Sequence, residues 1–157
     1  MATTEGALLD RRVIVAEARR WIGTPYLHQA SLRGAGTDCL GLVRGVWRGV
    51  TGEEPETPPP YTPDWAELHG RETLLEAAVR HFTRLDDLAA AAPGDVLLFR
   101  WRPSYPCKHV AIVSDAGPTG RLSIIHAYDR HEVAEHALPH AWRGKVAAVF
   151  SFPGVAN

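Results

Sequence analysis

Thr37-Asp38-Cys39-Leu40-Gly41-Leu42-Val43 is the stretch of this sequence that decides the fold. It places a cysteine at the start of a helical stripe, and apolar residues follow at the spacing of one helix face: Leu42, Val43, Val46, Trp47 and Val50. Asp38 or Thr37 is placed to cap this helix, so Cys39 falls in the first turn. There the positive end of the helix dipole favours the thiolate, which is the nucleophilic form. A cysteine on a buried stripe is otherwise a small apolar residue, and the histidines downstream decide between these two interpretations.

The composition is that of a soluble globular chain, because 45% of the 157 residues are apolar and 22% are charged. This length predicts a single domain, residues 1–157, with its core between about residues 11 and 153. A net charge of -1 provides no basic field to attract nucleic acid, so no nucleic-acid partner is expected. Cys39 and Cys107 are the only cysteines and do not form a disulfide framework, so both are expected to be reduced.

Membrane insertion is not expected, because no apolar run approaches the roughly 18 residues that span a bilayer. The stretch from Met1 to Asp10 has no basic region followed by an apolar one, and so does not resemble a secretory signal peptide. The sequence therefore predicts synthesis in the cytoplasm without a signal peptide. If the protein acts outside the cytoplasm, another route must deliver it.

Helical patterns come first along the chain, and strand patterns follow. Besides the Cys39 helix, helices are expected over about residues 11–22 and 71–82. Short strands bounded by turn residues are expected over 96–101, 109–114, 122–127, 132–137 and 146–152, with a hairpin connection at 117–120. The proline-rich stretch from Pro55 to Pro63 is expected to be an exposed loop within the domain. Helices first and strands second favour an α+β domain with an antiparallel sheet.

Two histidines stand at matching ends of neighbouring strand patterns. His109 begins one strand, and His126 ends the next. In a hairpin the start of one strand lies beside the end of the other, so the two imidazoles are expected to be neighbours at one edge of the sheet. Facing the start of the Cys39 helix, they would form a Cys-His-His set in the order nucleophile, base and orienting residue.

The other histidines and Cys107 allow further interpretations. His28 lies in the loop before Cys39 and is a candidate for lining a substrate groove. The remaining histidines are expected to be surface or loop residues: His69, His81, His131, His136 and His140. The metal alternative is a zinc site that combines Cys107 with Cys39, His109 and His126. This set lacks the close paired spacing of structural zinc motifs, so zinc binding is the less favoured interpretation.

The sequence resembles the NlpC-type cell-wall cysteine peptidases, which have the papain-like fold. The matching pieces run in order along most of the chain: Gly23–Tyr26, Asp38–Val43, Pro93–Phe99, His109–Val113 and Ile125–Ala127. Each piece is weak alone, but all of them in the right order are specific. The resemblance implies N-terminal helices packed on an antiparallel sheet of roughly five to six strands.

The resemblance also implies roles for individual residues. It implies that Cys39 is the nucleophile, that His109 is the general base and acid, and that His126 orients His109. Tyr26 matches a tyrosine whose hydroxyl lies near the oxyanion site, and Asp38 and His28 are assigned with it to the substrate and oxyanion region. The family commonly cleaves the γ-D-glutamyl to diamino-acid bond of peptidoglycan stem peptides. It needs no metal or organic cofactor.

Two departures from the family pattern concern the substrate groove. Leu27–Ser31 replaces a segment that usually ends in Gly-Gly, and Leu40 replaces the usual serine after the cysteine. With these two departures and the proline-rich insertion, the sequence is similar to the members of the family found in phage tails and gene transfer agents. The similarity implies phage-like tail or baseplate partners. It also implies action in the periplasm or cell wall after delivery on a phage-like particle or release by lysis.

Two other functions stay open at the level of sequence. The first is a non-catalytic tail or baseplate component that binds the cell wall and keeps only the fold. The second is a cysteine amidase or acyltransferase that acts on a protein or lipid substrate, since pocket shape sets specificity.

Overall fold

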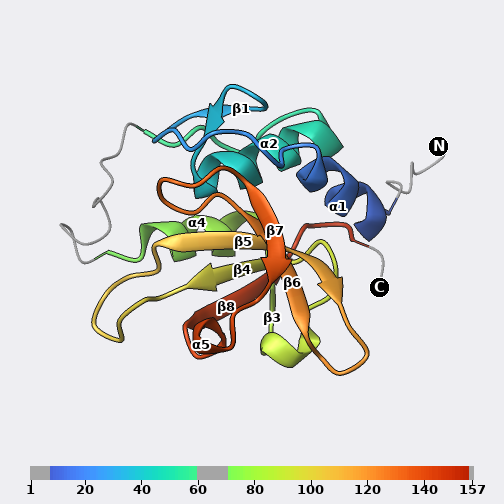
Figure 1. The fold of residues 1–157 in the computed structure, drawn as a ribbon, viewed down its shortest axis with the longest axis vertical. Helices are drawn as coiled ribbons and strands as arrows, with labels where there is room; N and C mark the ends of the chain where they lie inside the picture. Colours follow the sequence, from blue (N-terminus) through green and yellow to red (C-terminus); the bar gives the residue numbers. More distant parts are fainter. Residues whose placement is uncertain (1–7, 60–70, 156–157) are drawn as a thin grey trace, which may run out of the picture.

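The fold is built on a six-stranded antiparallel sheet with helices packed against it (Figure 1). The structure is a computed structural model and describes residues 8–59 and 71–155. The strands are β3 (Thr83–Leu85), β4 (Val96–Phe99), β5 (His109–Ala116), β6 (Leu122–His126), β7 (Ala134–Ala137) and β8 (Val146–Ser151). They lie in the order β3-β8-β4-β5-β6-β7, and each neighbouring pair is antiparallel. The predicted α+β fold with an antiparallel sheet is therefore confirmed.

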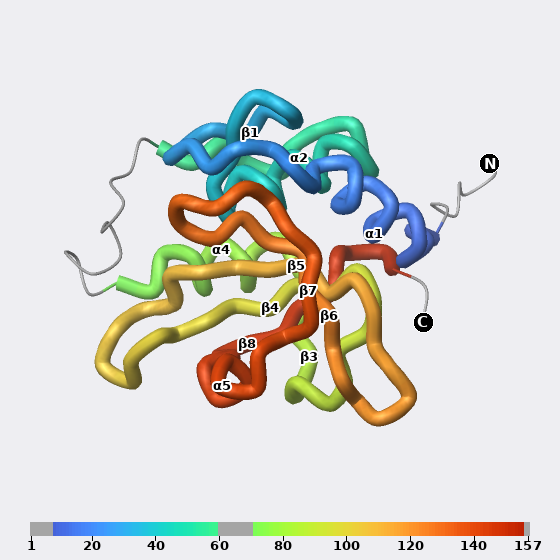
Figure 2. The backbone as a smooth tube through the Cα atoms, in the orientation of Figure 1, coloured from blue at the N-terminus to red at the C-terminus, as the bar shows by residue number. Residues whose placement is uncertain are grey.

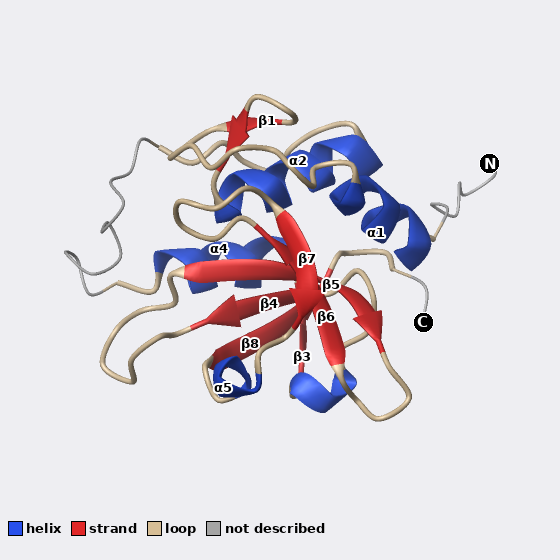
Figure 3. Ribbon diagram, viewed as in Figure 1, coloured by secondary structure: helices blue, strands red, loops and turns tan. Residues whose placement is uncertain are grey.

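One face of the sheet is covered by α1 (Arg11–Arg19), α2 (Cys39–Thr51) and α4 (Thr73–His81), as the ribbon in Figure 3 shows. Their apolar stripes pack on the inward residues of the central strands in one buried cluster, which includes Ile14, Leu42, Val46, Leu98 and Ile112. The stripe predicted from Cys39 onward is the buried face of α2. This packing fixes the start of α2, and with it Cys39, against the sheet.

The opposite face of the sheet carries a second, smaller core. It contains Leu97, Phe99, Ala111, Val113 and Ile124. The short helix α5 (His140–Arg143) and the 3₁₀ helix η1 (Leu88–Ala90) border it with Trp142 and Leu88. The central strand β4 is buried along its whole length, which explains why its sequence is a continuous apolar run rather than an alternating one.

The start of α2 depends on a cap and on two close approaches. Asp38 Oδ1 accepts a hydrogen bond of 2.7 Å from Gly41 N, which satisfies one of the free amides of the first turn. A Cβ at Gly41 would lie 1.9 Å from the carbonyl oxygen of Ala30, and one at Gly45 would lie 2.0 Å from the ring of Trp21. Glycine at these positions lets the preceding loop and α1 pack directly on the helix backbone.

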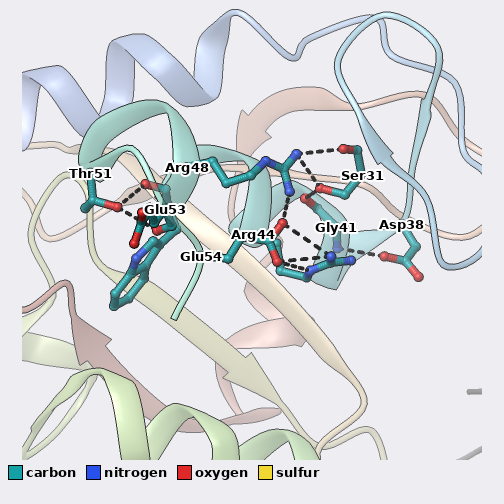
Figure 4. A network of polar contacts seen from close by, with 9 residues as sticks. Ser31, Asp38, Gly41, Arg44, Arg48, Thr51, Glu53 and Glu54 are labelled. Atoms are coloured by element: carbon teal, nitrogen blue, oxygen red, sulfur yellow. Dashed lines mark hydrogen bonds and ion pairs between the residues drawn. The ribbon is translucent and has the colours of Figure 1, made fainter. Parts of the chain in front are cut away.

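Before α2, the chain forms a small hairpin of β1 (Ser31–Leu32) and β2 (Gly36–Thr37). Figure 4 shows the polar contacts that hold this hairpin to the side of α2. Arg48 donates to the carbonyl oxygen of Ser31 at 2.7 Å and also pairs with Glu54. Arg44 pairs with Glu54 as well, at 3.1 Å. The residues just after α2 are thus tied back to the helix.

A buried carboxylate joins α1 to the sheet. Asp95 is fully buried and pairs with Arg11 at 2.6 Å. Its Oδ1 also accepts from the hydroxyl of Ser151 at 2.6 Å, and its Oδ2 accepts from Ala92 N at 2.8 Å. The charge is therefore compensated by a cation and two hydrogen bonds, as a buried carboxylate requires.

The expected elements are present, and their ends shift by a few residues. The first helix ends at Arg19 rather than near residue 22, because the chain turns there toward Gly23 in the left-handed region at φ 88°. The hairpin at 117–120 is confirmed, with Gly117 N bonded to Arg121 O. The short elements β1, β2, β3, η1 and α5 were not predicted from the sequence, because they carry no periodic pattern of their own. Strand β3 forms because it pairs with β8.

Part of the predicted proline-rich loop, residues 60–63, and His69 lie outside the described residues. Within the part of the chain that the structure describes, no helix combines the length and apolarity needed to cross a membrane. The backbone tube in Figure 2 shows the path of α2 above the central strands, where the candidate site lies.

Candidate active site

Three histidines form a hydrogen-bonded row across β5, β6 and β7. His109 Nε2 lies 2.8 Å from His126 Nδ1, and His126 Nε2 lies 2.7 Å from His136 Nε2. The last ring continues to the backbone, with Nδ1 of His136 2.9 Å from the carbonyl oxygen of Ala137. The predicted contact between His109 and His126 is therefore present. The expectation for His136 was incomplete: it is exposed, but it lies on β7 and contacts His126.

Strand register explains how His136 reaches the site. In the β6–β7 pair, His126 lies opposite Ala134, and Ile124 lies opposite His136. His136 is thus one diagonal step from His126 on the same face of the sheet, a separation that a long ring can bridge. The sequence signal was a second histidine ten positions after His126, but it becomes informative only when this register is known.

Cys39 begins α2 and lies beside the backbone that flanks His109. Its Sγ is 3.9 Å from the carbonyl oxygen of Lys108, to which the thiol donates. Backbone N–H groups, that of Val110 foremost, also lie within hydrogen-bonding range of the sulfur. Cys39 as a whole residue is partly exposed, although its Sγ is surrounded by protein atoms. The start of α2 and the backbone at the start of β5 are therefore neighbours, while the assignment of Cys39, His109 and His126 as one catalytic set stays a prediction.

The sulfur is a neutral thiol in this arrangement. Burial of Sγ, followed by the negative charge of Asp38, raises the pKa of the Cys39 thiol to about 12. The hydrogen bonds from the backbone N–H groups lower this pKa but do not outweigh the two opposing effects. The backbone N–H groups thus favour the thiolate, but burial and Asp38 outweigh them in the resting site. Ionisation of Cys39 has to be coupled to proton transfer.

The two buried imidazoles are neutral as well. Burial, and then the neighbouring His126, hold the pKa of His109 well below its ordinary value. Burial, followed by His136 and His131, lowers the pKa of His126 to about 4. A neutral imidazole can accept a proton, so His109 is in the form that a general base needs.

Aromatic rings enclose this histidine pair. Trp101 stacks on His109 with 5.6 Å between ring centroids and an interplanar angle of 24°. Trp142 and Tyr128 meet the same ring edge-on, at 6.2 Å and 5.6 Å. The rings leave His109 and His126 only 5% and 3% exposed. They explain both the lowered pKa values and the fixed orientation of the imidazoles.

The predicted substrate and oxyanion residues lie next to Cys39, on the loop before α2. Tyr26 forms a β-bridge with Thr37, two residues before Cys39. Burial, and then the neighbouring Cys39 and Asp38, raise the pKa of its phenol. His28 Nδ1 lies 4.0 Å from Asp38 Oδ2. The structure thus brings Tyr26, Asp38 and His28 to the same side of the site, while their roles stay predictions.

Asp38 has a clear structural task in addition. Its Oδ2 accepts a hydrogen bond of 2.8 Å from Gln29 N, while its Oδ1 caps α2. Gln29 adopts φ 65°, a left-handed conformation that is unfavourable for a residue with a side chain. The carboxylate therefore joins the cap of the helix to the strained loop that carries Tyr26 and His28.

The zinc alternative gains no support from the geometry. Among residues 8–59 and 71–155, no group of three or more His, Cys, Asp and Glu side chains is arranged to hold a metal ion. Cys107 is buried, and its backbone N–H donates to Glu72 at 3.1 Å. Burial, followed by the charge of Glu72, raises the pKa of the Cys107 thiol to about 11. Cys107 is thus a protonated thiol within the core.

Comparison with known proteins rests on structure, because no family model and no curated protein matches the sequence. The NlpC/p60 domain of the peptidoglycan hydrolase SagA matches with a TM-score of 0.60 at 27% identity, over 90% of this chain and 98% of that one. An NLP/P60 family protein of Staphylococcus aureus, described as similar to a lipoprotein, matches with a TM-score of 0.59 at 19% identity. NlpC2 of Trichomonas vaginalis matches with a TM-score of 0.62 at 17% identity.

The coverage of these matches differs. The staphylococcal match covers 100% of this chain and 46% of the staphylococcal protein. The Trichomonas match covers 96% of this chain and 48% of NlpC2. The chain therefore spans about half the length of these two relatives, and nearly all of the SagA domain.

The fold and the cysteine–histidine site together define the chain as a cysteine peptidase of the papain-like class. Within this class, its structural neighbours include the NlpC/p60 domain of the peptidoglycan hydrolase SagA and further NlpC and NLP/P60 proteins, which supports the family predicted from the sequence.

Proposed function

We propose that the protein is a peptidoglycan hydrolase that cleaves the γ-D-glutamyl to diamino-acid bond of stem peptides. The observation that carries this proposal is the position of Cys39 at a helix start, with its Sγ 3.9 Å from the carbonyl oxygen of Lys108. The next residue, His109, is hydrogen-bonded to His126. The match to the NlpC/p60 domain of SagA over nearly its full length supports the substrate class.

Acylation begins with two neutral groups. The thiol proton of Cys39 passes to Nδ1 of His109, because Nε2 of that ring is bonded to His126. Sγ attacks the carbonyl carbon of the scissile amide, and the electron pair of the carbonyl bond moves to its oxygen. In this proposal the backbone N–H groups at the start of α2 and the hydroxyl of Tyr26 stabilise this oxyanion.

Breakdown of the tetrahedral intermediate releases the diamino acid. The imidazolium of His109 gives its Nδ1 proton to the leaving amine, the C–N bond breaks, and a thioester to Cys39 remains. A water molecule then loses a proton to His109 and attacks the thioester. The thiolate leaves, takes the proton back, and the γ-D-glutamyl carboxylate is set free.

A basic pocket beside the site supports a substrate that carries carboxylates. The pocket has a volume of about 390 Å³ and is lined by Trp101, Arg102, Tyr105, Pro106 and Lys108. Trp101 forms its wall on the side of His109, on which its ring stacks. Stem peptides carry free α-carboxylates next to the scissile bond, and the two basic residues complement that charge.

Digestion of purified peptidoglycan by the wild type and by Cys39→Ala tests the proposal. Mass spectrometry should find new amino termini on the diamino acid with the wild type and none with the variant. Cys39→Ala protein that digests walls at the wild-type rate would refute the role of Cys39. Unchanged stem peptides together with cleavage of other amides or thioesters would instead favour the amidase or acyltransferase function.

Delivery by a phage-like tail is a separate proposal, which rests on the sequence resemblance alone. Quantitative mass spectrometry of density-purified particles from the producing cells should find the protein in constant proportion to tail proteins. Its presence only in the unassembled fraction would contradict the association.

A further inference from the structure

The direction of the hydrogen bonds in the histidine row follows from its last acceptor. A carbonyl oxygen can only accept, so the contact of 2.9 Å between His136 Nδ1 and Ala137 O requires the proton on Nδ1. In a neutral ring Nε2 then carries a lone pair. His126 must therefore donate from its own Nε2 across the 2.7 Å contact.

The same reasoning continues to the base. His126 has its proton on Nε2, so its Nδ1 is an acceptor, and His109 donates to it from Nε2 at 2.8 Å. Nδ1 of His109 is left with a lone pair. This is the nitrogen that takes the Cys39 proton in the mechanism above.

We propose that His136 is a positioning residue that sets the tautomers of both buried imidazoles and so prepares His109 Nδ1 as the base. The inference rests on the proposed function for its effect on catalysis, but the tautomers can be measured without any substrate. It adds a fourth residue to the predicted Cys-His-His set, an exposed histidine on the edge strand β7.

A donor in place of the acceptor at position 136 has a defined consequence. If the group there donates, His126 must accept at Nε2 and carry its proton on Nδ1. His109 then accepts at Nε2 and carries its own proton on Nδ1, where it blocks transfer from Cys39. One change at an exposed position therefore reverses the direction of the hydrogen bonds along the row as far as His109. The changed residue contacts neither the substrate nor the sulfur of Cys39.

Three variants at position 136 distinguish an acceptor from a donor at the end of the histidine row. His136→Glu presents only acceptors to His126, His136→Lys presents only donors, and His136→Phe presents neither. His140→Glu and His140→Lys are the matched controls, because His140 is also exposed and lies outside the row at the start of α5. All are compared at pH 8, above the ordinary titration range of imidazole.

Two measurements are made on the full-length protein with ¹⁵N-labelled histidine. Long-range ¹H–¹⁵N spectra report which nitrogen of each ring carries the proton, and peptidoglycan digestion reports activity. The wild type and His136→Glu should show His109 protonated on Nε2, and His136→Lys should show it on Nδ1. Activity should fall about 100-fold or more in His136→Lys, because a base in the wrong tautomer loses its proton-transfer contribution. His136→Phe should show mixed tautomers and an intermediate loss.

The outcomes separate the two proposals. Equal activity and equal His109 tautomers in the Glu and Lys variants would overturn the role of His136 even if the wild type cleaves peptidoglycan. A reversed tautomer in His136→Lys would support this role even if the wild type cleaves no peptidoglycan, and then the proposed function alone would fail. A loss of activity as large in His140→Lys as in His136→Lys would reduce the effect to surface charge and overturn the inference.

Discussion

Acidification should destabilise the fold through the buried imidazole of His126. Its pKa is lowered to about 4 from 6.5, chiefly by burial. As the pH falls below 6.5, the unfolded chain binds a proton at this histidine and the folded chain does not. The stabilising contribution is therefore complete above 6.5 and is lost as the pH falls toward 4. A difference of about 2.5 pH units at 1.36 kcal/mol per unit corresponds to roughly 3 kcal/mol.

Urea denaturation of the wild type and of His126→Asn between pH 7.5 and 4.5 measures this contribution. Asparagine does not titrate, and its oxygen can accept from His109 Nε2 at the place of the original Nδ1. Carboxylates elsewhere affect both proteins alike, so the difference in the free energy of unfolding reports His126 together with its effect on the pKa of His109. By pH 4.5 the wild type should have lost about 2.5 kcal/mol more than the variant. His140→Asn is the control and should follow the wild type. Parallel pH curves for the wild type and His126→Asn would refute the reasoning.

Three further outcomes are expected. Asp38→Asn keeps an oxygen for the helix cap but removes the charge that raises the pKa of the Cys39 thiol, so alkylation by iodoacetamide at pH 8 should be faster; an unchanged rate would contradict this. Asp95→Ala leaves Arg11 without its buried partner and should cost about 3 kcal/mol in urea denaturation, whereas a cost below about 1 kcal/mol would show that the pair contributes little. Arg102→Gln should raise KM for stem peptides and leave kcat nearly unchanged, and a fall in kcat alone would place Arg102 in the chemistry instead.

The parts of the fold that local chemistry determines were predictable from the sequence. Asp38 and the apolar stripe behind Cys39 specify the start and the buried face of α2 without reference to any other element. The hairpin at 117–120 likewise follows from its own turn residues. His109 and His126 could be paired because a hairpin joins their strands.

What could not be predicted depends on contacts between distant segments. His136 enters the row only through the register of β7 on β6, and no residue near His136 specifies that register. The neutral state of Cys39 follows from burial under the assembled sheet and from the charge of Asp38, while its position in the sequence indicates only the helix dipole. Short pieces such as β3 exist because a partner strand offers them hydrogen bonds.

The glycines of α2 also limit how far this enzyme can be adjusted. The smallest side chain that can replace glycine is the methyl group of alanine. At Gly41 and Gly45 the Cβ of that methyl group would lie about 2 Å from another atom. The spacing between the nucleophile helix, its loop and α1 therefore cannot be tuned gradually by substitution at these two sites. A saturation library selected for activity should return glycine alone at both, while solvent-facing sites on the same helix drift freely. Variation in specificity has to come instead from the loops around the sulfur.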